Sequence, residues 1–295
     1  MPINKYNNIF IKKMENPLPI NENENENENE VVNMDDPNLK LGGKKKKKII
    51  IISIIIVLAL LITIIAVTLS FTLKVENELE PLVFNSTSGN HTHTIIFMPG
   101  YSNRPEDFKK VLTQKINFSK KNDTTIVVLR SPKVPITYNN TENYAWYDII
   151  DIPLDDLSDI NLDDLKNSAK VLERYINNEV NILNGDYGKI IIGGHSQGAS
   201  IAMYQAYNAK VNYGGVFAFS GFLPPGNITG EKRLLNTYMG FGDHDDVILP
   251  EYINKTTDDI MAFEGFNLYI RKGHKHHVCT AQTIDVGKFL DRIIK

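Results

Sequence analysis

The most continuous hydrophobic segment of the chain is residues 49–73, which are mostly Ile, Leu and Val and include no charged residue. As a helix rising about 1.5 Å per residue, the segment spans roughly 38 Å, enough to cross a hydrocarbon layer of ~30 Å with some tilt. A core helix rarely carries apolar residues on every side over such a length. The alternative is a buried helix or parallel strand, whereas a cleavable signal peptide is disfavoured because the segment is long and begins after residue 48. We therefore predict a transmembrane helix over residues 49–73.

After residue 92, short apolar runs alternate with segments of helical periodicity. We expect strands at residues 94–98, 125–129, 189–193, 215–219, 237–241 and 268–271. We expect helices at residues 105–118, 162–183, 197–208 and 280–294. Strands separated by helices imply an α/β domain, in which helices flank both faces of a mostly parallel sheet. Ligands bind such sheets at the carboxyl ends of the strands, so we expect the functional site at that edge.

The segments on either side of the hydrophobic run are polar. Residues 1–48 include five consecutive Asn–Glu pairs, at residues 21–30. Low-complexity sequence of this kind has too little apolar surface to offset the chain entropy that folding would cost. We therefore predict a disordered tail over residues 1–48, a polar stalk over residues 74–92 and the α/β domain over residues 93–295.

The charges that flank residues 49–73 predict the orientation of the helix. Five lysines occupy residues 44–48, whereas Glu76, Glu78 and Glu80 follow the hydrophobic run. Because Lys and Arg remain on the cytoplasmic side, we expect a single-pass type II membrane protein whose α/β domain is lumenal or extracellular. All seven Asn-x-Ser/Thr triplets also follow the run, and they begin at Asn85, Asn90, Asn117, Asn122, Asn139, Asn227 and Asn254. Such an excess is typical of secretory glycoproteins, although an Asn-rich sequence also produces these triplets by chance.

Composition excludes several functional classes. The formal net charge of −3 and the pI near 6.2 argue against a protein that binds nucleic acid through a basic surface. The single cysteine, Cys279, excludes an intramolecular disulfide and a Cys-rich zinc site.

Residues 194–198, Gly-His-Ser-Gln-Gly, lie between an expected strand and an expected helix. This is the strand, sharp turn and helix of a nucleophile elbow. Glycine suits positions 194 and 198 because side chains there would clash with the neighbouring strand and helix, while Ser196 adopts strained dihedral angles. Ser196 would then stand at a helix N-terminus, where the helix dipole favours developing negative charge. We therefore take Ser196 as the candidate nucleophile.

A serine nucleophile needs a base, and the base needs a carboxylate that orients it. In folds with a nucleophile elbow the order along the chain is Ser, then Asp or Glu, then His. The candidate bases are His274, His276 and His277 after the last expected strand, with His244 a further possibility. The candidate carboxylates, in the loop after the preceding expected strand, are Asp243, Asp245 and Asp246. Both loops follow carboxyl ends of strands, where the residues can meet Ser196.

Residues 95–294 resemble the acyl-protein thioesterase group of the small α/β-hydrolases, also described as phospholipase/carboxylesterases. The matching stretches are residues 146–149 (Trp-Tyr-Asp-Ile), 193–199 (Gly-Gly-His-Ser-Gln-Gly-Ala), 219–224, 242–245 and 273–294. The resemblance implies an α/β-hydrolase fold with the triad Ser196, Asp245 and His276. It also implies an oxyanion hole made by the backbone N–H groups of Tyr101 and Gln197, which commonly supply about 3 kcal/mol each. Trp146 would line an acyl groove.

The sequence departs from that family at two positions near the expected site. Pro99 stands where relatives usually carry a histidine, and Asp246 stands where they usually carry a proline. Relatives are mostly soluble cytosolic proteins, whereas this chain has a predicted membrane anchor. A lumenal enzyme would not meet palmitoylated cysteines in the cytosol.

We therefore predict a serine hydrolase of acyl esters or thioesters, held at a membrane by residues 49–73 and needing neither a cofactor nor a metal. One alternative is a zinc site formed by the histidines of residues 274–277 with a carboxylate, although Lys275 would repel a cation. The other is a catalytically inactive hydrolase-like ectodomain that serves as a membrane-anchored binding module.

Overall fold

The computed structural model describes residues 43–295, and it separates into a helical unit that ends at Glu78 and a folded unit over residues 79–295. Most of the predicted disordered tail, residues 1–42, lies outside the described residues. The helical unit contains α1 (Gly43–Glu78), which extends the predicted helix at both ends. Within it, Ile50–Thr68 is long and apolar enough to cross a membrane, and none of this segment is buried.

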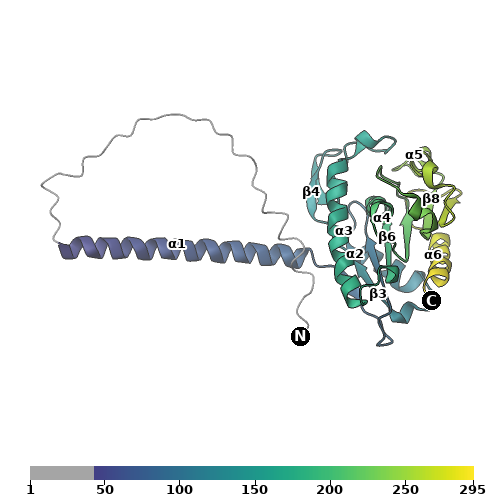
Figure 1. Ribbon diagram of the computed structural model, residues 1–295. Coiled ribbons are helices and arrows are strands. Elements are labelled where there is room, and N and C mark those ends of the chain that lie inside the picture. The colour runs from purple at the N-terminus through teal and green to yellow at the C-terminus, as the bar shows by residue number, and fades with distance from the viewer. Residues whose placement is uncertain (1–42) are drawn as a thin grey trace. The chain divides into compact units, whose positions relative to one another are not determined.

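The folded unit is built on a seven-stranded sheet (Figure 1). Its strands are β1 (Leu82–Phe84), β2 (His93–Met98), β3 (Thr124–Val128), β6 (Ile190–His195), β7 (Gly215–Phe219), β8 (Thr237–Gly242) and β9 (Phe266–Arg271). Their order across the sheet is β1-β3-β2-β6-β7-β8-β9, and all neighbours are parallel except β1 and β3. The central strands are continuous apolar runs because helices cover both of their faces. The predicted mostly parallel sheet is therefore confirmed.

The helices of the folded unit form a layer on each face of the sheet. They are α2 (Pro105–Lys110), α3 (Leu162–Ile182), α4 (Gln197–Asn208), α5 (Pro250–Thr257) and α6 (Thr280–Ile293). The short turns are η2 (Val111–Lys115), η3 (Lys121–Asp123), η4 (Leu157–Asp159), η5 (Tyr187–Lys189), η6 (Gly230–Leu234) and η7 (Asp258–Ile260). Helices α3 and α4 pack on each other and on β2 and β6, while α6 packs with η2 against β7 and β8.

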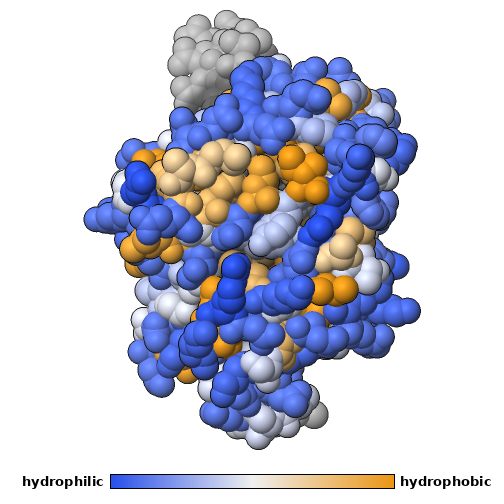
Figure 2. Space-filling view, turned by 90° about the vertical axis from the view of Figure 1, so that its right-hand side faces the viewer, coloured by the Kyte–Doolittle hydropathy of each residue, from blue (hydrophilic) through white to orange (hydrophobic). Residues whose placement is uncertain are grey.

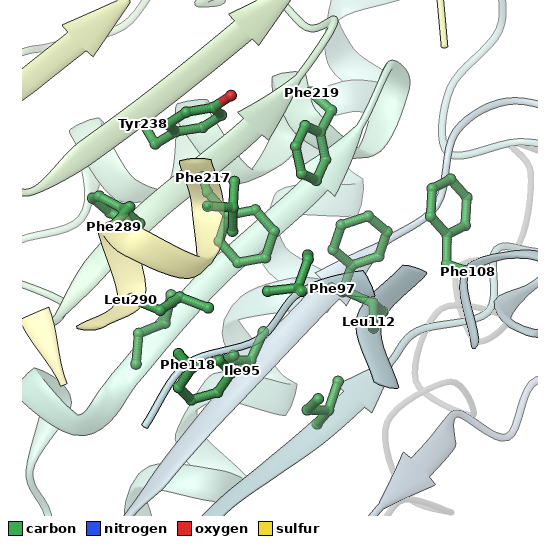
Figure 3. Close-up of a cluster of buried hydrophobic side chains, with 14 of the residues drawn as sticks. Ile95, Phe97, Phe108, Leu112, Phe118, Phe217, Phe219, Tyr238, Phe289 and Leu290 are labelled. Carbon is green, nitrogen blue, oxygen red and sulfur yellow. The ribbon is translucent and has the colours of Figure 1, made fainter. Parts of the chain in front are cut away.

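Aromatic side chains make the core between the sheet and the α2–α6 layer (Figure 3). The ring of Phe97 lies 4.9 Å from that of Phe108 and 5.9 Å from that of Phe217 (centroid distances). The Phe217 ring occupies the space beside Gly193, where an added Cβ would lie 2.2 Å from the ring. Burying each such ring contributes about 1.5–3 kcal/mol. This packing fixes the strands whose carboxyl ends carry the candidate site.

The folded unit begins before the residue that the sequence predicted. β1 pairs with β3 from Leu82 to Phe84, and the backbone N–H groups of Thr87 and Ser88 donate to the Asn122 carbonyl at 2.8 and 3.1 Å. Residues 74–92 therefore do not form a separate stalk: α1 continues to Glu78, and Leu82–Phe84 join the sheet as β1. A strand of three residues is too short to leave a periodic pattern.

Two segments that the sequence did not predict flank the carboxyl edge of the sheet. One is the hairpin of β4 (Lys133–Ile136) and β5 (Thr141–Tyr144). The other is residues 149–154, which we call the strap. The Leu154 N–H donates to the Val247 carbonyl at 2.8 Å, and the Leu249 N–H donates to the Leu154 carbonyl at 3.0 Å. The strap is thereby bound to the loop that follows β8.

The face of the folded unit shown in Figure 2 is mostly hydrophilic, with a band of apolar side chains across its upper half and smaller apolar spots elsewhere. The large exposed hydrophobic residues of the folded unit are Tyr138, Ile150, Ile182, Leu234, Met261, Ile270 and Ile284. Scattered apolar residues of this kind are normal on a water-exposed surface. In α1, by contrast, apolar side chains are exposed on consecutive residues, as in Ile54, Ile55 and Ile56.

Candidate active site

Ser196 occupies the sharp turn between β6 and α4. Its backbone angles are φ 54° and ψ −122°, in a region that residues other than glycine rarely adopt. The Ser196 N–H donates to the carbonyl of Phe219, at the end of β7, at 2.9 Å, and α4 begins at the next residue. The serine is therefore held at the carboxyl edge of the sheet and at the N-terminus of a helix.

The glycines of this turn permit a close approach of backbone segments. A Cβ at Gly198 would lie 2.1 Å from the carbonyl oxygen of Met98, in β2. A Cβ at Gly194 would lie 2.4 Å from the backbone of Gly198. Side chains at either position would separate β6, α4 and β2, so the glycines have the role expected of them in a nucleophile elbow.

The structure brings Ser196, His276 and Asp245 together from the loops after three strands. The Ser196 Oγ lies 2.8 Å from His276 Nε2. His276 Nδ1 lies 2.9 Å from Asp245 Oδ1 and 2.8 Å from Oδ2. The Asp245 side chain is fully buried, and that of His276 is 12% exposed. An imidazole that donates from Nδ1 to this carboxylate has Nε2 free to accept the serine proton.

The turn after Asp245 fixes the direction of its carboxylate. The backbone N–H groups of Val247 and Ile248 donate to Asp245 Oδ1 at 3.1 and 3.0 Å. Two such bonds satisfy a buried carboxylate oxygen and hold the group in one orientation. The Asp245 carboxylate is thus held by two backbone N–H groups while it faces His276.

The other candidate acids and bases have different partners. Asp246 is exposed and pairs with Lys275 at 2.6 Å, and this hydrogen bond lowers the pKa of the Asp246 carboxyl. Asp243 Oδ1 accepts the Gly273 N–H at 2.5 Å. The rings of His274 and His277 contact each other, with centroids 5.8 Å apart, and His244 is exposed. Among residues 43–295, no three His, Cys, Asp or Glu residues gather in a way that could hold a metal ion.

His195 packs beside the triad. Its ring centroid lies 5.2 Å from that of His276 and 5.5 Å from that of Phe108. Burial, with a smaller contribution from the charge of His276, lowers the pKa of His195 to about 3. His195 is therefore neutral at physiological pH and adds no positive charge beside the His276 imidazole.

A cavity of about 310 Å³ opens at Ser196. Its lining consists of Tyr101, Asn103, Tyr147, Ile149, Ile152, Leu154, His195, Ser196, Gln197, Val247, Ile248 and His276. The wall away from the triad is apolar. It is formed by side chains of the strap and by Val247 and Ile248 of the turn after Asp245. The sequence predicted four of the polar lining residues, Tyr101, Ser196, Gln197 and His276, but not the strap, whose irregular backbone leaves no periodic signal.

Trp146 does not line this cavity, contrary to the prediction; its neighbour Tyr147 does. Trp146 is buried, and its indole N–H donates to the Pro99 carbonyl at 2.8 Å. Its backbone N–H donates to Gln197 Oε1 at 3.0 Å. The only polar atom of the indole is thus satisfied inside the fold. Trp146 therefore supports Pro99 and Gln197 and does not contact a ligand.

A sequence model of the family described as phospholipase/carboxylesterase matches residues 80–294. The chain belongs to this family. The match begins at residue 80 and so includes β1, in agreement with the start of the folded unit.

Relatives within the phospholipase/carboxylesterase family are distant in sequence. Acyl-protein thioesterase 1 of Candida albicans is 28% identical over 197 residues, covering 63% of this chain and 81% of the relative. Lysophospholipase-like protein 1 of Mus musculus is 26% identical over 188 residues, covering 60% of this chain and 76% of the relative. The family is thus one of ester and thioester hydrolases, and the predicted membership is confirmed.

Solved structures show the same fold. Arabidopsis thaliana SOBER1 superposes with a TM-score of 0.62 at 16% identity, covering 69% of this chain and 99% of that one. Zea mays acyl-protein thioesterase 2 gives a TM-score of 0.57 at 18% identity, covering 73% and 99%. The predicted α/β-hydrolase fold is confirmed.

Proposed function

We propose that this protein is a serine hydrolase that cleaves acyl esters or thioesters, with Ser196 as nucleophile, His276 as general base and Asp245 as the residue that orients the base. The observation that carries the proposal is the continuous chain of hydrogen bonds from the Asp245 carboxylate through His276 to the Ser196 hydroxyl, at 2.8–2.9 Å. The Ser196 end of this series of hydrogen bonds lies in a cavity that can admit a substrate.

Acylation follows from these contacts. As the Ser196 Oγ attacks the acyl carbonyl carbon, its proton passes to His276 Nε2, and the carbonyl π electrons move to oxygen. The buried Asp245 carboxylate stabilises the imidazolium that forms. When the tetrahedral intermediate collapses, the bond to the leaving alcohol or thiol breaks, and His276 gives that group its proton. The acyl group stays on Ser196.

The backbone N–H groups of Tyr101 and Gln197 are the proposed donors to the oxyanion. Both residues line the cavity at Ser196. Gln197 is the first residue of α4, where a backbone N–H has no partner within the helix. Its side chain is held by Trp146 and by the Tyr147 carbonyl, to which Gln197 Nε2 donates at 2.8 Å. Removing such a donor typically costs about 3 kcal/mol of transition-state stabilisation.

Deacylation uses the same groups in the reverse direction. His276 takes a proton from water as the water oxygen attacks the acyl carbonyl, and it returns that proton to Ser196 Oγ as the acid leaves. Every proton transfer is made by residues of this chain, so the mechanism requires no cofactor or metal. The apolar wall of the strap provides a surface for an acyl chain.

We also propose that α1 anchors the enzyme in a membrane and that the hydrolase unit is lumenal or extracellular. The lysines at residues 44–48 precede the apolar segment, and this asymmetry supports the orientation. All seven Asn-x-Ser/Thr asparagines are exposed, whereas Asn103, Asn143, Asn208 and Asn267 are at least partly buried. Exposure of every acceptor supports glycosylation, because an attached glycan must extend into solvent.

A fluorophosphonate probe tests the catalytic proposal. The full chain in detergent should be labelled, and Ser196→Ala should abolish the labelling. Ser220→Ala is the matched control: Ser220 is buried at the end of β7, and its hydroxyl has no hydrogen-bond partner within residues 43–295. Labelling that persists in Ser196→Ala contradicts the proposal. A folded wild-type protein that takes no label favours the binding-module alternative.

A glycosidase tests the topology. The full chain made in a cell with a secretory pathway should lose mass on treatment with a glycosidase that removes N-linked glycans. An unchanged mass would reverse the proposed orientation.

A further inference from the structure

We propose that Asn139 carries an N-linked glycan at the mouth of the active-site cavity and that this glycan restricts access by bulky substrates. The inference rests on the proposed topology and hydrolase activity, and it goes beyond them by assigning one modification site to substrate selection. Asn139, Asn140 and Thr141 form the acceptor triplet, at the tip of the β4–β5 hairpin.

The first support is the contact between Asn139 and a residue of the cavity. Asn139 Nδ2 donates to the Tyr101 hydroxyl at 3.0 Å, and Tyr101 lines the cavity at Ser196. Of the seven acceptor asparagines, all within the described residues, Asn139 is the one whose side chain hydrogen-bonds to a cavity-lining residue. A sugar on this nitrogen must therefore lie next to the Tyr101 ring.

The second support is the accessibility of the acceptor amide. Asn139 is exposed, and the Thr141 hydroxyl donates to Asn139 Oδ1 at 2.7 Å. The next residue, Asn140, has a φ of 51°, so the chain reverses direction at the acceptor. Acceptor and hydroxyl thus lie together on a turn, a location in which a bulky glycan is accommodated without loss of packing.

The third support is the attachment of the hairpin to the cavity wall. The Tyr138 N–H donates to the Ile149 carbonyl at 2.8 Å, and Asp148 accepts the Thr137 N–H at 2.7 Å. Ile149 itself lines the cavity. The hairpin and α5 stand at the same end of the folded unit in Figure 1. The glycan would be carried by a segment held in place beside the cavity, not by a free loop.

The modification needs an oligosaccharide donor of the lipid-linked pyrophosphate class. The bond from the sugar C1 to the pyrophosphate oxygen breaks, a C–N bond forms at Asn139 Nδ2, and one amide proton leaves. The remaining N–H can still donate to the Tyr101 hydroxyl. A small ester diffuses past such a glycan, whereas an acyl group attached to a folded protein requires a macromolecular surface to approach Ser196.

The experiment compares three variants of the full chain made in glycosylating cells. Thr141→Ala removes the acceptor triplet and keeps the Asn139 amide, whereas Thr141→Ser keeps the triplet. Asn90→Gln removes a triplet just before β2, at the edge of the sheet opposite to the one that carries Ser196. Glycan occupancy is measured by peptide mass spectrometry. Activity is measured on a short-chain nitrophenyl ester and on a folded protein bearing an acyl thioester on cysteine, and the ratio of the two rates is compared.

We expect Thr141→Ala to lose one glycan and to raise the ratio of thioester to small-ester activity several-fold. Thr141→Ser and Asn90→Gln should match the wild-type ratio, and wild type made without glycosylation should match Thr141→Ala. An unoccupied Asn139, or an unchanged ratio after loss of its glycan, overturns the inference. Absence of all hydrolysis with Asn139 occupied instead overturns the proposed activity, and absence of glycans with hydrolysis intact overturns the topology and this inference together.

Discussion

Replacing Asp245 with asparagine changes one charge at the buried end of the proposed triad while conserving its shape. Asp245 Oδ1 already accepts the N–H groups of Val247 and Ile248, so the new amide keeps its oxygen there and turns its NH₂ group toward His276. Two donors cannot face each other. This arrangement favours the His276 tautomer that presents Nδ1 as an acceptor and carries its proton on Nε2, which then cannot accept the proton of Ser196.

The expected loss follows from that change of tautomer. In serine proteases the equivalent substitution lowers kcat about 10⁴-fold, which corresponds to about 5 kcal/mol of activation free energy. We expect Asp245→Asn to lower kcat/KM on a short-chain nitrophenyl ester by this order, with little change in Tm. Asp246→Asn is the control, because Asp246 is exposed and pairs with Lys275; it should leave kcat/KM within about twofold, as expected for an exposed ion pair. An Asp245→Asn enzyme that keeps more than about a tenth of wild-type activity would refute this reasoning.

The remaining predictions concern the cavity, the neutral histidine and the elbow. Leu154→Ala should shift the preference among nitrophenyl esters toward longer acyl chains, because Leu154 lines the cavity; the control Ile150→Ala removes a strap side chain that is 44% exposed and should leave the chain-length profile unchanged. Burial lowers the pKa of His195 to about 3, so its unfolded form, with a pKa near 6.5, binds the extra proton. As the pH is lowered from about 7 to about 5, the free energy of unfolding should therefore fall more steeply in wild type than in His195→Phe. Denaturant titrations at each pH give this free energy, and an equal dependence on pH in the two proteins would contradict the prediction. Gly198→Ala places a Cβ 2.1 Å from a β2 carbonyl oxygen, which should cost about 1–3 kcal/mol of stability and greatly reduce fluorophosphonate labelling. Gly230→Ala, with open space at its Cβ, should do neither.

The parts of the fold that the sequence predicted are those with a local signal. β6 begins with three buried isoleucines and ends in Gly193, Gly194 and His195, and α4 follows Ser196, so the strand, the elbow and the helix are readable from one short segment. Asp245 and His276 were each one of several candidates in their loops. The resemblance to a family singled out these two among the candidates. In the structure His276 lies beside Ser196, and Asp245 lies beside His276.

The parts that the sequence missed depend on contacts between distant residues. β1 has three residues and exists because Leu82 pairs with Val128. The strap is irregular, and its position depends on hydrogen bonds to Val247 and Leu249. The sequence predicts that Trp146 lines an acyl groove, whereas its indole N–H donates to the carbonyl of Pro99, which is distant in sequence. No local periodicity encodes such pairings.

Trapping of the covalent intermediate tests the catalytic proposal most directly. The full chain is mixed with an excess of a nitrophenyl ester, quenched in acid within the first turnover, digested and analysed by mass spectrometry. We predict that the acyl group is found on the peptide that contains Ser196 and that the amount of adduct matches the initial burst of nitrophenol. Ester turnover by the wild-type enzyme without an adduct, or with the adduct on a different residue, would contradict the account.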